Sequence, residues 1–169
     1  MNNNTKYLVT SFLILYLFQL PVIHRFIFFD IAFGFFYIGF FLLLPKSLNP
    51  LLALTYCFSG GLVIDLFSNT LGVHAMATLG TFQIRNFWLN ALTKSSSEEF
   101  QINIYEMGFI KFLIYLFPLI IVHHTIIFIV ENGSFINFSW TTQKIISSGI
   151  LSSLVVILIC LLIAPKPKS

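Results

Sequence analysis

The chain has 169 residues, of which 57% are hydrophobic and only 9% are charged, with a formal net charge of +3. Soluble domains carry about 25% charged residues, so this composition excludes a water-soluble enzyme, a disordered chain and a nucleic-acid-binding module. What remains is an integral membrane protein with little mass outside the bilayer.

Six apolar runs have the length that a membrane-crossing helix requires, which is about 17 to 25 residues. The sequence therefore predicts an all-α fold, a single membrane domain over residues 1–169 built as a bundle of six transmembrane helices. Pro45 ends the second run, and Pro50 opens the third at a position where its missing N–H costs nothing. The expected spans are about 7–23, 26–44, 51–67, 72–92, 108–130 and 144–164.

The basic residues indicate the orientation of this bundle. With six spans the two termini share one side, and most Lys and Arg residues fall on that side. An excess of basic residues marks the cytoplasmic side, so both termini are expected in the cytoplasm. The residues expected there are Lys6, Lys46, Lys94, Lys166 and Lys168, with Arg85 and Lys111 close enough to snorkel toward that side, against Arg25 and Lys144 on the other.

The third expected span combines small residues with a carboxylate. Gly61 and Asp65 are four residues apart and so share one face of a helix. Ser59, Gly60 and Gly61 permit the close approach of a neighbouring helix backbone. An ionisable group inside a span is costly, which makes Asp65 a candidate functional residue.

A short turn after Asp65 folds the fourth span back on the third and brings His74 near the carboxylate. An Asp65–His74 pair would reduce the cost of burying both groups and would staple the hairpin. The alternative is an outward polar site for a small ligand or a metal. Even catalytic zinc requires about three protein ligands, so two residues do not form a metal site, and neither a metal nor a cofactor is expected.

Three further polar residues lie inside expected spans. His123 and His124 are adjacent in the fifth span, and adjacent helical positions point about 100° apart, so both cannot serve one site. We expect hydrogen bonds to neighbouring helices, with a proton relay as the alternative. Arg85 gives the cytoplasmic half of the fourth span a polar character, and that half is expected either to leave the membrane as an interfacial helix or to contact a partner.

The chain contains no nucleophile elbow, HExxH motif, phosphate-binding loop or paired intramembrane carboxylates, so the sequence gives no support to an enzyme. The longest cytoplasmic connection, about 93–107, contains Ser95 and Glu98 in the spacing of a capping box. A docking site for a cytoplasmic partner and a solvated connector both remain open for this loop.

Residues 44–46 and 58–75 resemble the signature of the rod shape-determining MreD family of small bacterial inner-membrane proteins. The family has a glycine-bearing helix ending in G-x-x-x-D-L, followed by a short turn into L-G. The residues at those positions are Gly61, Asp65, Leu66, Leu71 and Gly72. The family often has a proline before the polar residue at the start of the second span, whereas Phe29 precedes Asp30 here.

The resemblance implies a non-enzymatic component of the cell-elongation machinery in the bacterial cytoplasmic membrane. Such proteins associate with the bitopic protein MreC. They act with the actin-like MreB, the glycosyltransferase RodA and a class B penicillin-binding protein in lateral peptidoglycan synthesis. The family's fold is related to the substrate-binding subunits of energy-coupling-factor transporters, so a vitamin-binding subunit is the rival interpretation.

Overall fold

The structure is a computed structural model that describes residues 3–17, 19, 27–93, 102–132 and 138–165. The strands β1 (Ile27–Phe28) and β2 (Ala32–Phe33) form a small antiparallel hairpin. The helices are α1 (Asn3–Ser11), the π-helix η1 (Phe12–Leu17), α2 (Ile38–Leu42), α3 (Pro50–Ser68), α4 (Val73–Leu92), α5 (Ile104–Met107), α6 (Phe109–Asn132) and α7 (Phe138–Ile163).

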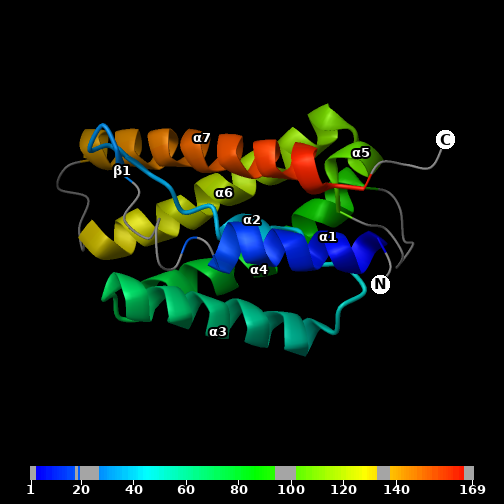
Figure 1. Ribbon diagram of the computed structural model, residues 1–169. Helices are drawn as coiled ribbons and strands as arrows, with labels where there is room; N and C mark the ends of the chain where they lie inside the picture. The colour runs from blue at the N-terminus through cyan, green and yellow to red at the C-terminus, as the bar shows by residue number, and fades with distance from the viewer. Residues whose placement is uncertain (1–2, 18, 20–26, 94–101, 133–137, 166–169) are drawn as a thin grey trace.

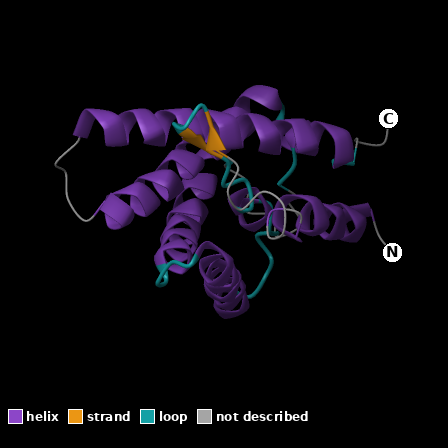
Figure 2. Ribbon diagram, turned by 60° about the vertical axis from the view of Figure 1, so that its left-hand side comes forward, coloured by secondary structure: helices purple, strands orange, loops and turns teal. Residues whose placement is uncertain are grey.

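The long helices pack in sequence but are not all parallel. Helix α3 packs on α4, α4 on α6 and α6 on α7, while α1 lies against α7 and the hairpin rests on α7 (Figures 1 and 2). Figure 2 shows α7 along its length and α3 nearly end-on. Helix α1 begins and α7 ends at the same end of the bundle in both views. The consecutive helix pairs α3–α4 and α6–α7 are thus neighbours in space, and α4 also packs on α6.

The expectation of a predominantly helical membrane protein is confirmed in its coarse form. Three helices in the described residues are long and apolar enough to cross a membrane: Pro50–Ser68, Phe109–Glu131 and Phe138–Ile163. Helix α4 has 20 residues but is not among them, and it contains Arg85 with other polar residues. Several predicted positions lie outside the described residues, namely Arg25, Lys94, Lys166, Lys168 and the proposed capping box at 95–99.

Asn49 and Asn69 set the ends of α3. The Asn49 side chain accepts a hydrogen bond from the Leu51 backbone N–H at 2.9 Å, and Pro50 follows at the first helical position. Asn69 ends the helix in a left-handed conformation, with φ of 56°. The next few residues then start α4, so α3 and α4 form a tight antiparallel hairpin.

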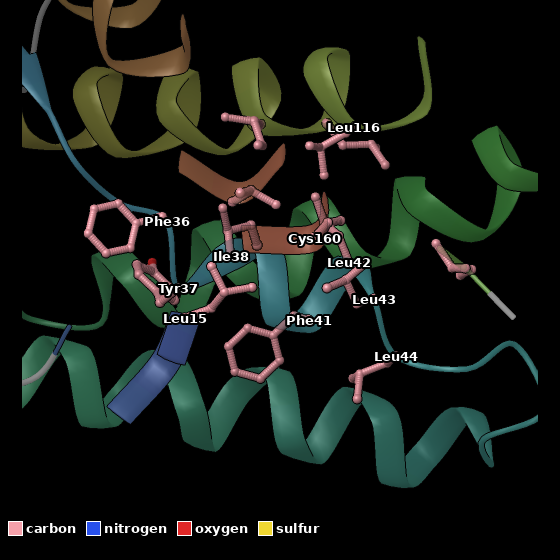
Figure 3. Packing of buried hydrophobic residues seen from close by; sticks show 14 of the residues in the cluster. Leu15, Phe36, Tyr37, Ile38, Phe41, Leu42, Leu43, Leu44, Leu116 and Cys160 are labelled. Atoms are coloured by element: carbon pink, nitrogen blue, oxygen red, sulfur yellow. The ribbon is translucent and has the colours of Figure 1, made fainter. Parts of the chain in front are cut away.

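The continuous helix expected over residues 26–44 is wrong. The described part of this segment consists of the β1–β2 hairpin, an extended stretch and the five-residue helix α2. It still runs the length of the bundle, but through its middle: in Figure 3 its side chains pack with Leu116 of α6 and Cys160 of α7. Residues 34–44, which we call the central strap, carry a buried run of Phe35, Phe36, Tyr37, Ile38, Phe41, Leu42, Leu43 and Leu44.

Side chains satisfy the backbone of the strap and of the adjoining hairpin. Gln19, which is 1% exposed, donates from Nε2 to the Gly34 carbonyl and accepts from the Tyr37 N–H at 2.7 Å. On α7, Ser148 and Ser152 accept from the backbone N–H of Phe33 and Phe35 at 2.8 and 3.1 Å. Non-helical backbone is tolerated at membrane depth only where it is buried in protein in this way.

Arg85 performs the same task at the other end of the strap. Its Nε donates to the Leu42 carbonyl at 3.1 Å, its Nη2 donates to the Leu44 carbonyl, and Tyr115 adds a 2.6 Å bond to Leu42. Arg85 is only 1% exposed, so its guanidinium is enclosed by the protein. The guanidinium caps the orphan carbonyls at the C-terminal end of α2, where a positive charge is favourable.

Replacing Gln19 with Leu should destabilise the protein, although it makes an apolar run more apolar. The change leaves a buried N–H and a buried carbonyl of the strap without partners, at a cost of about 1–3 kcal/mol each. We expect the free energy of unfolding in a denaturing-detergent titration to fall by about 3 kcal/mol. Gln83→Leu on the exposed face of α4 is the matched control, and equal losses for the two variants would contradict this account.

Candidate functional site

The α3–α4 hairpin closes on a contact that has no room for a side chain. A Cβ added to Gly61 would lie 2.4 Å from the Cα of Ala75 and 2.7 Å from its N. This distance is far below any normal contact, and the obstacle is backbone. Gly61 thus sets how closely the two helices approach, in the way the sequence suggests for this small residue.

The carboxylate of Asp65 lies directly beside that contact and binds the start of α4. It accepts from the backbone N–H of His74 and of Ala75, both at 2.9 Å, and from Thr70 Oγ1 at 2.5 Å. A negative group at a helix N-terminus satisfies orphan N–H groups and interacts favourably with the helix dipole. Asp65 therefore staples the hairpin through the backbone of His74, whereas the sequence argument assigns this role to the imidazole.

The imidazole of His74 instead faces Tyr37 of the central strap. Tyr37 Oη lies 2.9 Å from His74 Nδ1 and 2.8 Å from His123 Nε2, and all three residues are at most 1% exposed. A phenol donates one proton, so Tyr37 can donate to one imidazole and must accept from the other. The tautomers of the two histidines are consequently linked through a single hydroxyl.

His124 extends this set of buried polar groups toward α7. Its Nδ1 lies 2.8 Å from the Ile120 carbonyl, and its Nε2 lies 3.2 Å from Ser152 Oγ, the hydroxyl that also accepts from the strap. The rings of His123 and His124 are 5.5 Å apart. The two side chains point in different directions, as their 100° separation suggests, yet both connect to the central strap. His123 contacts Tyr37 of the strap directly, and His124 contacts it through Ser152. His123 Nδ1 is buried and has no hydrogen-bond partner in the part of the chain that the structure describes.

The remaining residues singled out from the sequence divide into internal and external positions. Gly60 lies under Phe41, whose Cζ would be 2.3 Å from an added Cβ. Ser59 is exposed and donates to the Thr55 carbonyl of its own helix at 2.7 Å. Gly72, with φ of +78°, precedes α4 and faces open space, and the Leu71 side chain is 102% exposed. Leu71 thus takes no part in packing within the chain.

Two hollows border these residues. An apolar groove of about 400 Å³ lies between η1, the strap and α3. Its walls include Phe12, Tyr16, Phe40, Phe41, Leu44, Tyr56, Ser59, Gly60 and Val63. A smaller cavity of about 130 Å³ lies where α3 and α6 end, and His74 and Glu131 are among its lining residues.

The sequence argument misses Tyr37, Gln19 and Ser152, although these residues connect the buried histidines and the strap. Each is a polar residue inside an apolar run, and this pattern in the sequence indicates a buried polar contact for all three. On α7, Ser148 and Ser152 also share a face by their spacing of four. In the described residues no group of three or more His, Cys, Asp or Glu is placed to hold a metal ion.

A comparison with protein-family models, with curated proteins and with solved structures finds no match to this chain.

Double-mutant cycles can separate the two roles of His74. Tyr37→Phe and His74→Phe remove the same hydrogen bond, so their effects on the free energy of unfolding should be coupled by about 0.5–3 kcal/mol. Asp65→Asn and His74→Phe should add to within about 0.5 kcal/mol, because Asp65 binds the backbone N–H that Phe retains. Strong coupling in the second cycle, with none in the first, would contradict the observed arrangement.

Two glycines offer a matched test of the close helix contact. Gly61→Ala should lower the free energy of unfolding by about 2 kcal/mol or more, since the new methyl group meets the backbone of Ala75. Gly80→Ala places its methyl 3.3 Å from the Cδ1 of Ile126, a side-chain end that can rotate away. It should be neutral or stabilising by up to about 1 kcal/mol, because Ala favours the helix. Similar losses for both would refute the assignment.

Proposed function

We propose that the chain is a non-enzymatic membrane scaffold of the MreD type in the cell-elongation machinery of a bacterium. It would bind an MreC-like bitopic protein through its lipid-facing helix surface. Through that partner it would act with an MreB-like filament, a RodA-like glycosyltransferase and a class B penicillin-binding protein in lateral wall synthesis and cell shape.

The proposal rests on where the residues that resemble the MreD signature lie: some are inside the α3–α4 hairpin and others are on its outer surface. Gly61 and Asp65 lock the α3–α4 hairpin from inside, by the contacts to Ala75 and to the start of α4. Leu66 and Leu71 point outward from the same hairpin, 81% and 102% exposed. A rigid hairpin that presents apolar side chains suits a protein whose work is to offer a surface to another protein.

The proposal includes a topology of six passes with both termini in the cytoplasm. The central strap would be the second pass, one that is helical only over α2. The common end of α1 and α7 supports the even number of passes. The basic residues support the placement of that end on the cytoplasmic side of the bacterial inner membrane.

The rival interpretation, a vitamin-binding transporter subunit, requires a cavity of about 300–1,000 Å³ with several convergent polar groups. The cavity beside His74 has only about 130 Å³. The groove of about 400 Å³ has the volume, but its walls are mainly aromatic and aliphatic. We therefore favour the scaffold. A vitamin retained through purification would favour the rival.

The double variant Leu66→Ser/Leu71→Ser tests the scaffold directly. Loss of two exposed anchors should reduce co-purification of the MreC-like protein by about tenfold while leaving the thermal unfolding midpoint unchanged. Leu162→Ser, at a side chain 84% exposed near the end of α7, is the matched control.

In rod-shaped cells depleted of the native protein, the wild type and the control should restore the rod shape, and the double variant should leave the cells round. Gly61→Leu should also lose the partner, together with expression, because the hairpin itself is disturbed. Full partner recovery and normal cell shape with the double variant would overturn the proposal.

A further inference from the structure

The small cavity at the end of α3 and α6 has walls of two kinds. One wall is apolar and comes from the hairpin and the stretch after it: Ile27, Phe33 and Phe35. The other wall is polar and comes from three other places in the chain, with Ser68 and Thr70 at the end of α3, His74 in α4 and Glu131 in α6. Residues far apart in sequence thus converge on a space of about 130 Å³, which suits a small group and not an acyl chain.

The polar wall consists mainly of hydrogen-bond acceptors. Glu131 supplies a carboxylate, and Ser68 Oγ is buried with no hydrogen-bond partner among the described residues. Thr70 donates its proton to Asp65, so its oxygen keeps lone pairs free to accept. The C-terminal ends of α3 and α6 add partial negative charge at the same place. The nitrogen Nδ1 of His74 already faces Tyr37 and is turned away from this task.

We propose that this cavity binds a primary ammonium group, carried either by a small free amine or by an ethanolamine-type lipid headgroup. Such a group has three N–H donors for the three acceptors Glu131, Ser68 and Thr70. The ring of Phe33 has a π face that attracts cations, since Lys144 Nζ already lies over it. A trimethylated ammonium has no N–H to donate and more bulk, so the site distinguishes the two headgroups. The inference does not depend on the scaffold function.

Lys144 is the cation that would compete for this site. Its Nζ lies 5.5 Å from the centre of the Phe33 ring and 5.8 Å from that of Trp140. An ammonium ligand is therefore repelled by Lys144 and attracted by Glu131. Removing the Glu131 charge should weaken the binding of a cationic ligand, and removing the Lys144 charge should strengthen it. The two variants are therefore expected to change binding in opposite directions.

The experiment uses the full chain in nanodiscs and measures the thermal unfolding midpoint, which rises with any ligand that binds the native state. One arm replaces half of the phosphatidylcholine with phosphatidylethanolamine. A second arm adds ethanolamine to pure phosphatidylcholine discs. A rise of about 3 °C in either arm is expected. A rise in the first arm alone assigns the lipid headgroup, and a rise in the second assigns the free amine. No rise in either arm overturns the proposal.

Variants then test the site itself. Glu131→Gln should abolish the rise, and Lys144→Gln should enlarge it. Glu106→Gln, the same change near the opposite end of α6, should leave it as in the wild type. If Glu131→Gln fails to fold, Ser68→Ala serves in its place and should halve the rise or more. A rise that persists in both variants, or that Lys144→Gln removes, overturns the proposal.

Discussion

Backbone hydrogen bonding inside lipid is the constraint on which this structure depends. A helix satisfies its own N–H and carbonyl groups, but an extended segment does not, and each unsatisfied group at membrane depth costs several kcal/mol. The central strap lies in the middle of the bundle and is helical only over α2. It is stable there because Gln19, Ser152 and Arg85 supply partners for its backbone, and Ser148 does the same for Phe33 of the adjoining hairpin.

That constraint also explains why the buried polar residues stand where they do. Arg85 has carbonyls and a phenol as partners, not a carboxylate, since its task is to end α2. Tyr37 belongs to the strap and holds His74 of α4 and His123 of α6 on either side. The buried polar side chains of Arg85, His74 and His123 thus all contact the central strap. The outward faces of the helices that carry them can remain apolar toward lipid.

Hydropathy predicts the long helices well and the strap badly, for one physical reason. The runs that form α3, α6 and α7 are apolar over at least 18 residues. An apolar run of that length is typical of a membrane-spanning helix. Residues 26–44 are equally apolar, but a buried segment such as the strap is apolar whether it is helical or not, so composition does not distinguish the two. At Asp65 the sequence identifies the right residue and hairpin, yet not the backbone N–H groups it binds, because these depend on how α4 starts.

The strap has a consequence for how the protein is made. Residues 33–44 leave the ribosome long before Ser148 and Ser152 of α7, which accept hydrogen bonds from the N–H groups of Phe33 and Phe35. If this stretch entered lipid alone, the N–H of Tyr37 and the carbonyls of Gly34, Leu42 and Leu44 would lack their side-chain partners, which is costly in hydrocarbon. This stretch therefore gains its full set of hydrogen bonds only when α7 is in place, so the architecture closes around it late instead of being assembled in the order of synthesis.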